Sequence, residues 1–460
     1  MDLRAIIEEH NPHWNGAPRE DRLPFRRDAV SRLTEALLAQ SSARETRRAH
    51  VLTGLRRVGK STVLRQVVAG LMEREVPPSS ILYFEMDDPR TQGASLEDVL
   101  QASGLESGWS AQRPRFLLLD EVGHDRNWKQ TIKRLADLGG KAPCVVVADS
   151  VAARLKASEM GESAVGRRTD LDLEPLSFAE VARARGLSAG DPRDADGPAL
   201  SLEADTYLLR GGMPSVVLAP GPGPDSAYPA LRADAALILS DAPRIREIRH
   251  PETLRMLWAI LSENPAIALN VKSLSDKRGP ARETIEQMLA VIRELLLIRE
   301  LPVFGGGPLA PARNPSKYFV ADCGIAAAHL SYRERAEDRV RGQLTEVAIL
   351  RHLAELAGPS HDAKLGYART AKDAEVDFVI ERSDVGRVAV EAKYGLHAAD
   401  DRAMEKLARV ATTLEADRAL LVSRSADLRR RTVEGIDVLA CPLWIFLAWP
   451  ERALRMEIQR

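Results

Sequence analysis

The sequence predicts a multidomain α/β protein whose first domain is built on a parallel β-sheet. Its N-terminal third contains apolar runs with strand character, separated by segments in which apolar residues recur at helical spacing. The strand candidates lie at 50–55, 81–86, 115–122 and 144–150, and the clearest helix candidates lie at 29–40, 61–74 and 127–138. Such alternation is typical of a parallel sheet covered by helices on both faces.

Three domains of ordinary size fit the 460 residues. A stretch rich in Gly, Pro and Asp at 186–199 predicts the first boundary near residue 190. We therefore expect domains at 1–190, 200–310 and 315–460. The last of them has the patterns of a helix at 340–356, strands at 375–381 and 387–394, a helix at 399–414 and a strand at 418–423.

The composition is that of a globular chain, with 45% hydrophobic and 28% charged residues. The 65 basic and 66 acidic residues nearly cancel, which argues against a uniformly basic nucleic-acid coat. Charge is nevertheless uneven, because residues 17–70 carry 12 basic and 5 acidic side chains, whereas 169–206 carry 3 basic and 9 acidic. We expect an anionic ligand in the N-terminal third.

Cysteine usage and the N-terminus predict a cytoplasmic protein that does not bind a membrane. Cys144, Cys323 and Cys441 are widely spaced, which supports neither a disulfide framework nor a zinc-thiolate site. The first residues lack the apolar core of a secretory signal, and no apolar run reaches the roughly 20 residues that span a bilayer.

Residues 54–61, GLRRVGKS, match the phosphate-binding pattern G-x-x-x-x-G-K-[ST] between a predicted strand and a predicted helix. Gly54 and Gly59 would let backbone amides close around phosphate oxygens at the start of the helix. Lys60 would contact the β- and γ-phosphates, and Ser61 would bind Mg²⁺. Within and directly after the motif, Arg57 and Thr62 complete the predicted nucleotide-binding loop.

A second motif, RFLLLDEV, places Asp120 and Glu121 at the carboxyl end of an apolar strand. Asp120 would hold the Mg²⁺ shell, and Glu121 would orient and polarise the attacking water. An isolated glycine-rich loop is often an ordinary turn, and an isolated acidic pair is often solvated surface. Together, in this order and each after its own strand, the two motifs predict ATP binding.

With these motifs the chain resembles the AAA-type P-loop ATPases of prokaryotes that carry a nuclease-like C-terminal domain of unknown function. The resemblance covers about residue 30 to the C-terminus. It rests on GLRRVGKST at 54–62, YFEMDDPR at 83–90, FLLLDEVGHDRNW at 116–128, PLSFAEV at 175–181 and YLLRGGMPSVVL at 207–218. It implies nucleotide-site roles for Lys60, Ser61, Asp120 and Glu121.

The resemblance implies two further roles. In the family a small polar run after the fourth strand senses the γ-phosphate, and here only Asp149 and Ser150 stand there, so Ser150 is the candidate sensor. A Gly-Arg pair precedes PLSF, which makes Arg167 the candidate arginine finger, supplied to a neighbouring subunit of an oligomer. The alternative for Arg167 is a surface salt bridge with the acidic residues at 170–174.

The segment from 270 to 304 resembles a winged helix, with a short helix, a turn and a longer helix. Leu269, Val271 and Leu274 would supply the core from the first helix, and Ile285, Met288, Leu289 and Ile292 from the second. Lys272, Lys277, Arg278 and Arg282 cluster around the turn and could contact DNA phosphates, among the acidic Asp276, Glu283 and Glu286. The alternative is a structural module between two domains.

The C-terminal third contains the D…E-x-K signature of the restriction-endonuclease-like fold, as Asp377, Glu391 and Lys393 on two strands of a predicted hairpin. Asp377 and Glu391 would hold Mg²⁺, Lys393 would orient the nucleophile or stabilise the transition state, and Glu346 on the preceding helix would be a further ligand. The alternative is a set of solvated salt-bridge partners. Valine rather than proline precedes Asp377.

These observations predict an ATP-hydrolysing protein that uses ATP and Mg²⁺ and acts on, or is regulated by, nucleic acid, DNA in the first place, with a metal-dependent nuclease as its effector. The alternative is a non-cleaving regulator or scaffold that binds DNA or protein.

Overall fold

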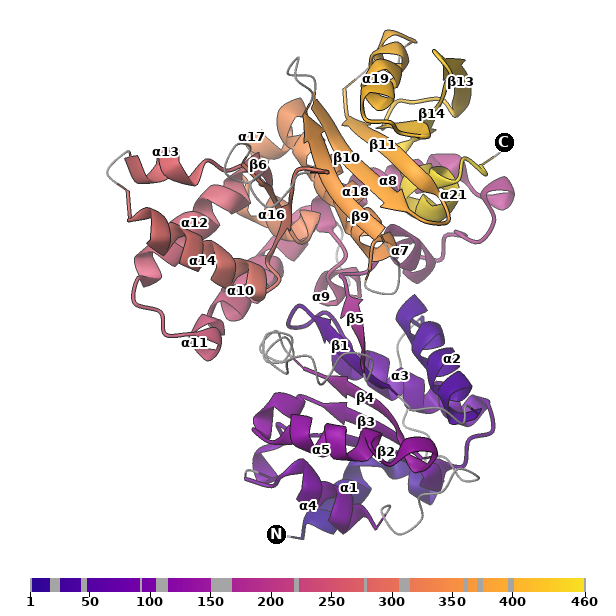
Figure 1. The fold of residues 1–460 in the computed structure, drawn as a ribbon, viewed down its shortest axis with the longest axis vertical. Helices are drawn as coiled ribbons and strands as arrows, with labels where there is room; N and C mark the ends of the chain where they lie inside the picture. Colours follow the sequence, from indigo (N-terminus) through magenta and orange to yellow (C-terminus); the bar gives the residue numbers. More distant parts are fainter. Residues whose placement is uncertain are drawn as a thin grey trace. The chain divides into compact units, whose positions relative to one another are not determined.

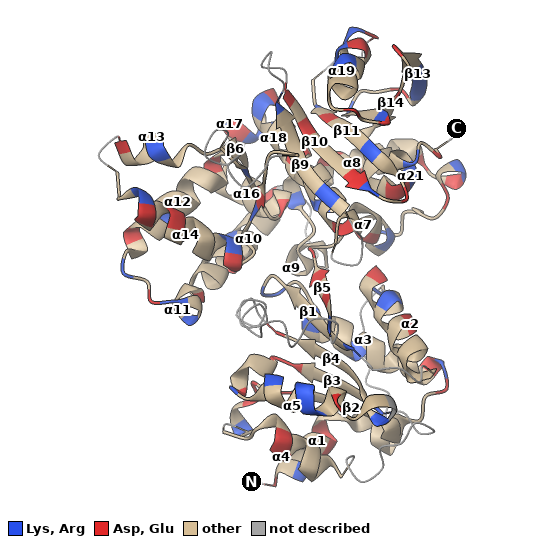
Figure 2. Ribbon diagram, in the orientation of Figure 1, with Lys and Arg blue, Asp and Glu red and all other residues tan. Residues whose placement is uncertain are grey.

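The computed structural model describes residues 2–16, 25–42, 48–91, 93–104, 115–149, 168–218, 223–276, 279–305, 315–358, 363–369, 375–395 and 401–458. The chain forms two compact units, Met1–Leu173 and Glu174–Arg460 (Figure 1). Basic and acidic residues are interspersed along the elements of both units (Figure 2). Over the described ranges, no helix combines the length and the apolar character that crossing a bilayer demands.

The first unit contains a five-stranded, all-parallel sheet, which confirms the parallel sheet expected from the sequence. Its order is β2-β3-β4-β1-β5, so β4 lies between the two strands that precede the predicted nucleotide-site motifs. The strands are β1 (Ala49–Gly54), β2 (Ile81–Glu85), β3 (Phe116–Asp120), β4 (Cys144–Ala148) and β5 (Arg168–Leu173).

Helices cover both faces of this sheet because successive strand side chains point to opposite sides (Figure 1). One face, with Val51, Leu117 and Val147, packs against α1, α4 and α5. The other face packs against α3, and α2 lies against α3 and β4. The helices are α1 (Leu3–His10), α2 (Asp28–Ser42), α3 (Lys60–Glu73), α4 (Leu96–Ser103) and α5 (Trp128–Ala136).

The second unit begins with a helical part in which α12, α14 and α16 pack against a small sheet. Its helices are α7 (Phe178–Ala184), α8 (Gly197–Arg210), α9 (Pro214–Val217), α10 (Tyr228–Leu239), α11 (Ala242–Ile245), α12 (Pro251–Glu263), α13 (Val271–Asp276), α14 (Arg282–Glu294), α16 (Cys323–His329) and α17 (Tyr332–Arg335). An antiparallel sheet of order β6-β8-β7 is formed by β6 (Ala266–Ala268), β7 (Ile298–Leu301) and β8 (Lys317–Val320).

The expected pair of helices in this part is present as α13 and α14. The four residues predicted to form the core of the longer helix are all buried, whereas α13 contains no fully buried residue and holds Val271 and Leu274 half-buried. Leu269, just before α13, is also buried. α13 therefore contributes less apolar surface to the core than the spacing of its apolar residues predicts.

A six-stranded mixed sheet of order β13-β14-β12-β11-β10-β9 completes the unit. Its β10–β11 pair is the expected hairpin, and β11, β12 and β14 are parallel to one another. One face packs against α19, around Ala389, Met404 and Leu421. The elements are α18 (Asp338–Leu356), β9 (Ala363–Arg369), β10 (Glu375–Arg382), β11 (Gly386–Lys393), α19 (Asp401–Thr413), β12 (Arg418–Ser423), β13 (Arg429–Val433), β14 (Ile436–Pro442), α20 (Leu443–Ala448) and α21 (Pro450–Leu454).

The first residues of the second unit are fixed by α18 and α8. Arg351 is buried and donates from Nε and Nη2 to the carbonyl oxygen of Pro175, at 3.0 and 2.7 Å. The Tyr207 hydroxyl donates to the carbonyl oxygen of Leu176 at 2.9 Å, and the backbone amide of Phe178 donates to Nε2 of His352 at 3.1 Å. The PLSF segment is therefore part of the core of this unit.

Candidate functional site

The predicted phosphate-binding loop connects β1 to α3, as its motif requires. Two loop residues adopt left-handed backbone conformations, Arg57 with φ 67° and Gly59 with φ 100°. Gly59 is the residue before the first residue of α3, and its lack of a Cβ allows that conformation. Gly54 must also be glycine, because a Cβ there would lie 2.5 Å from the carbonyl oxygen of Leu173. Arg57 itself is exposed, and Ser61 and Thr62 are half-buried in the first turn of α3.

The ammonium group of Lys60 is held inside this loop. Its Nζ donates to the carbonyl oxygens of Gly54 at 3.1 Å and Leu55 at 3.2 Å, and the residue is 5% exposed. Burial lowers the pKa of Lys60, an effect that the carboxylates of Glu121 and Asp120 oppose. Lys60 is thus desolvated and lies close to the carboxylates of Asp120 and Glu121. Its present hydrogen-bond acceptors are two neutral carbonyl oxygens, which phosphate oxygens can replace.

Asp120 ends β3 and is 2% exposed. Burial raises the pKa of Asp120 to about 6, and a hydrogen bond from the Ser61 side chain opposes this rise. The two residues predicted to bind Mg²⁺ are therefore in contact. A hydroxyl and a carboxylate suit Mg²⁺, which commonly keeps several waters and takes only one or two protein carboxylates beside the substrate phosphates.

Glu121 and the end of β4 complete this part of the site. Glu121 has a left-handed backbone, with φ 49°, and its amide donates to Oδ1 of Asp120 at 3.1 Å. Asp149, directly after β4, is 3% exposed and packs against the loop that follows Glu121, where a Cβ on Gly123 would lie 2.4 Å from Asp149 Oδ2. Asp149 was not assigned a role from the sequence, although its place after an apolar strand is the available signal. Ser150 and Arg167 lie outside the described residues.

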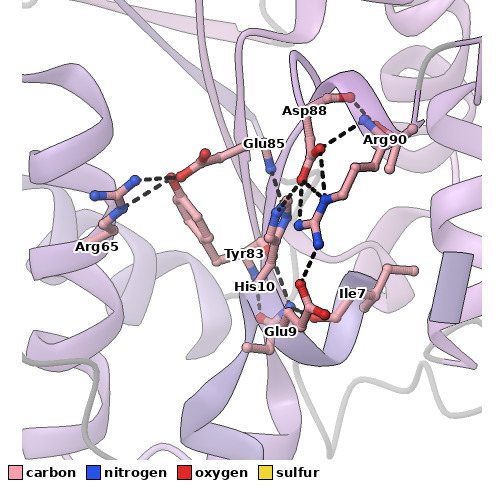
Figure 3. Close-up of polar contacts among 10 residues, drawn as sticks. Ile7, Glu9, His10, Arg65, Tyr83, Glu85, Asp88 and Arg90 are labelled. Atoms are coloured by element: carbon pink, nitrogen blue, oxygen red, sulfur yellow. Dashed lines mark hydrogen bonds and ion pairs between the residues drawn. The ribbon is translucent and has the colours of Figure 1, made fainter. Parts of the chain in front are cut away.

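A polar network links α3 and β2 to the N-terminal helix (Figure 3). The Tyr83 hydroxyl donates to Oε1 of Glu85 at 2.6 Å and lies 3.5 Å from Oδ2 of Asp120. Arg65 of α3 donates from Nε to the Tyr83 hydroxyl at 3.3 Å and pairs with Glu85 at 2.5 Å. Sequence reasoning missed this network, because its members come from three separate segments.

The network continues through a second set of contacts. His10 Nε2 lies 3.1 Å from Asp88 Oδ2, and Arg90 pairs with both Asp88 and Glu9, at 2.8 and 2.6 Å. Helix α1 is thereby joined to the segment after β2 (Figure 3). These contacts hold the segment that follows β2 next to α1.

The second unit brings together the predicted C-terminal residues. Asp377 of β10 accepts a hydrogen bond from the Ala392 amide on Oδ2 at 2.9 Å, and Lys393 Nζ lies 2.5 Å from Glu391 Oε1. Glu391 and Lys393 can pair because residues two apart on β11 project from the same face of the strand. The charge of Asp377 acts on both Glu346 and Glu391. Asp377, Glu391, Lys393 and Glu346 therefore form one electrostatic group.

Lys317 also belongs to this group, and sequence reasoning missed it. This lysine begins β8, is 8% exposed, pairs with Glu375 and lies 3.6 Å from Asp377 Oδ1. Burial acts to lower the pKa of Lys317, but Asp377 and Glu346 raise it above its ordinary value. No motif marks this lysine, since it lies in a different sheet from the carboxylates.

Two glutamates of this group, Glu346 and Glu391, are protonated more readily than ordinary carboxylates. Burial, and then the charge of Asp377, raise the pKa of both Glu346 and Glu391 above the usual range. Oε2 of Glu391 is buried and has no hydrogen-bond partner in the described part of the chain. Across the same ranges, no three His, Cys, Asp or Glu residues are arranged to hold a metal ion together. Asp377 and Glu391 thus offer two carboxylates, which suffices for Mg²⁺ only with water and substrate as further ligands.

The basic residues of the α13–α14 pair are exposed where they are described. Lys272 and Arg282 are exposed, and Arg282 pairs with Glu286 at 2.7 Å. Lys277 and Arg278 lie outside the described residues.

Comparison with known families agrees with this geometry. Residues 46–182 match the family model of an AAA domain. Residues 202–336 and 341–444 match two domains of unknown function, DUF8612 and DUF4143. The match to the AAA domain model therefore falls on the part of the chain that holds the five-stranded parallel sheet, and it is followed by matches to two domains of unknown function.

Relatives among curated proteins are uncharacterised. A protein of Haemophilus influenzae is 23% identical over 367 residues, which cover 76% of this chain and 84% of that protein. A protein of Mycobacterium tuberculosis is 25% identical over 364 residues, 78% of this chain and 71% of that protein. Among solved structures, the ORC2 protein of Aeropyrum pernix in ADPNP and ADP complexes is 13% identical, with 74% of this chain and 98% of that chain covered and a TM-score of 0.39.

Proposed function

We propose that the first unit binds and hydrolyses ATP and that the second unit acts on nucleic acid. The observation that carries the first part is the convergence of Lys60 with the Ser61–Asp120 contact at one end of the parallel sheet. A desolvated ammonium group beside a hydroxyl–carboxylate pair is suited to binding a nucleoside triphosphate together with its Mg²⁺. When bound, Mg²⁺ would neutralise charge that develops on the phosphates.

The roles of the chain's own residues follow from their positions. Lys60 would exchange the carbonyl oxygens of Gly54 and Leu55 for oxygens of the β- and γ-phosphates, while the amides of the loop enclose them. Glu121, held by its backbone contact to Asp120, would orient water for attack. Ser150 would sense the γ-phosphate, and Arg167 would reach the site of a second copy, which makes self-association part of the proposal.

ATP turnover by the full chain tests this proposal. Lys60→Ala should abolish both nucleotide binding and hydrolysis, whereas Glu121→Gln should retain binding and lose about 100-fold or more in kcat. Lys133→Ala, which changes an exposed lysine of α5, is the matched control and should leave both unchanged. Equal turnover by wild type and both site variants would exclude hydrolysis at this loop.

For the second unit we propose a nucleic-acid effector of restriction-endonuclease-like fold. Asp377 and Glu391 would hold Mg²⁺, Lys393 would stabilise the attacking group, and Glu346 would assist from α18. The alternation of helix, hairpin, helix and strand from α18 to β12 supports this assignment. The order β6, α13, α14, β7, β8, with β8 paired to both other strands, similarly supports a winged helix that contacts DNA phosphates.

A non-cleaving regulator is the second candidate, and a specific observation favours it. Lys317 and Lys393 already place two ammonium groups against Asp377 and Glu391, so the carboxylates have counter-charges within the chain. Such a unit would bind DNA or protein and report the nucleotide state without cutting.

Incubation with DNA and RNA in Mg²⁺ or Mn²⁺, with and without ATP, separates the two candidates. A nuclease should cut, and Lys393→Ala should abolish cutting while leaving DNA binding in EDTA intact. Binding without cutting under every condition supports the regulator. Binding that does not weaken as salt rises would contradict phosphate recognition in either case.

A further inference from the structure

The second unit contains a small polar pocket at the end of β11, the strand that carries Glu391 and Lys393. Its volume is about 190 Å³, and its lining consists of Asp205, Thr206, Leu209, Arg341, Tyr394 and Arg424. Tyr394 directly follows Lys393, and Arg424 follows Ser423, which pairs with Lys393 at the ends of the parallel strands β11 and β12. The pocket thus lies at the carboxyl ends of parallel strands, where α/β sheets commonly bind ligands.

Two lining residues have hydrogen-bond donors to spare. Arg341 Nε donates to the carbonyl oxygen of Arg335 at 2.7 Å, and its two terminal amino groups bond to nothing in the described ranges. Similarly, no described residue accepts from or donates to the Tyr394 hydroxyl. A guanidinium with two unused amino groups can bind two oxygens of one phosphate. A phenol beside it adds a third donor.

On the opposite wall of the pocket, the positive charge of Arg424 is neutralised by Asp205. Arg424 donates from Nε and Nη2 to both carboxylate oxygens of Asp205, at 2.7 and 2.6 Å, and its guanidinium lies 5.6 Å from the centre of the Tyr394 ring. Ser425 donates to the carbonyl oxygen of Gly395 at 3.1 Å, which joins the two strand ends. The lining therefore carries two guanidinium groups and one carboxylate, and the exposed Asp338 acts on Arg424 from nearby.

We propose that this pocket binds a phosphate group through Arg341 and Tyr394, with Asp205 as a negative charge that limits its affinity. The volume is below the range typical of sites for whole small molecules, so a single phosphate fits better than a nucleoside. Because Tyr394 directly follows Lys393 at the end of the strand that also carries Glu391, a backbone phosphate of nucleic acid is the leading source. If the phosphate belongs to nucleic acid, the inference rests on the proposed nucleic-acid function. Free inorganic phosphate is the other source.

Anisotropy of a labelled DNA duplex with the full chain in EDTA tests the first source, because no cleavage can occur there. Arg341→Gln should weaken binding about tenfold and reduce the slope of log affinity against log salt by about one. Arg339→Gln changes an exposed arginine of the same helix and should change neither value. Asp205→Asn should strengthen binding, a change of sign that misfolding cannot produce.

Calorimetry with inorganic phosphate tests the second source. It is done in a Lys60→Ala background, so that the loop of the first unit does not contribute. Loss of phosphate binding on Arg341→Gln, with DNA binding unchanged, assigns the pocket to free phosphate. Unchanged DNA and phosphate binding in both Arg341→Gln and Asp205→Asn overturns the proposal.

The result also separates this inference from the proposed function. If the wild type fails to bind DNA at any salt, the nucleic-acid function is wrong, and the phosphate measurement alone decides the pocket. If the wild type binds DNA and Arg341→Gln binds equally with the same salt slope, the function stands and the DNA-phosphate assignment of the pocket fails.

Discussion

The ammonium nitrogen of Lys317 lies 3.6 Å from Oδ1 of Asp377, although the lysine belongs to the three-stranded sheet and the aspartate to the six-stranded one. The same ammonium lies 5.3 Å from the centre of the Tyr367 ring. Lys317 stands within the DUF8612 match and Asp377 within the DUF4143 match. The charge balance of the carboxylate group is therefore set by two domains together.

Lys317→Met should destabilise the second unit by about 2 kcal/mol, because Asp377 and Glu375 lose a buried counter-charge. Denaturant unfolding followed by a probe in this unit measures the change. Lys364→Met is the matched control, since Lys364 pairs with Glu381 with its side chain 76% exposed and should contribute less than about 0.5 kcal/mol. The double variant Lys317→Met/Glu375→Gln should recover part of the stability that Lys317→Met loses. An equal loss of stability in Lys317→Met and Lys364→Met would contradict the argument.

Two helical glycines should respond to alanine with opposite signs. A Cβ on Gly324 would lie 2.0 Å from the carbonyl oxygen of Arg210, whereas nothing lies within 4 Å of a Cβ on Gly342. Gly324→Ala should cost about 3 kcal/mol because backbone must move, and Gly342→Ala should add about 0.5–1 kcal/mol through helix propensity. Thermal unfolding of both variants checks the order, and a stabilising Gly324→Ala would be inconsistent with the packing of α16.

Acidification should destabilise the second unit through His352. Its Nδ1 lies 2.8 Å from the Ala348 carbonyl oxygen and its Nε2 accepts from Phe178, so no site remains for a second proton. Burial lowers the pKa of His352 to about 3, with Arg351 adding to the effect. Between pH 6.5 and 3 the unfolded chain binds a proton that the folded chain does not, and stability falls as pH falls, by about 1.4 kcal/mol per pH unit.

His352→Gln retains an acceptor for Phe178 and should remove this part of the pH dependence. His250→Gln, at an exposed histidine, should leave it in place. Unfolding free energies measured at several pH values decide the matter. Parallel pH profiles of wild type and His352→Gln would mean that another group causes the acid loss.

Tyr83→Phe should raise the Mg²⁺ concentration needed for half-maximal ATP turnover about tenfold. The reason is that the Tyr83 hydroxyl lies between the carboxylates of Glu85 and Asp120 and positions them. The Arg65–Glu85 pair remains, so the fold should persist. Turnover measured against Mg²⁺ concentration gives the shift. Tyr332→Phe, on a tyrosine that is 79% exposed, serves for comparison, and identical Mg²⁺ curves for all three proteins would remove Tyr83 from the site.

Local patterns sufficed for the elements whose burial is regular. The strands β1 to β4 are fully or almost fully buried apolar runs, and the loop before α3 has a motif, so both could be predicted. β5 and β13 could not, because each is an edge strand with half-exposed or exposed charged residues, RTDLDL and RRRTV. An edge strand needs hydrogen bonds on one side only and keeps polar side chains in water.

Residues whose role depends on contacts between distant segments could not be predicted from the sequence. Asp120 and Lys60 each stand in a motif, but Lys317 becomes part of the carboxylate group only when β8 comes close to β10. The insertion of β4 between β1 and β3, which brings Asp149 to the site, is likewise a matter of strand order. No spacing along the chain encodes either relationship.

The attachment of Pro175 to Arg351 also bears on how such chains can recombine. The AAA match ends at residue 182, but the first unit ends at Leu173, so the PLSF segment has the sequence of one domain and the packing of the other. An exchange of domains between relatives that joined them after residue 182 would give Arg351 a foreign partner for its buried guanidinium. Viable exchanges should therefore fall near residue 173, or carry α18 along with the segment that it holds.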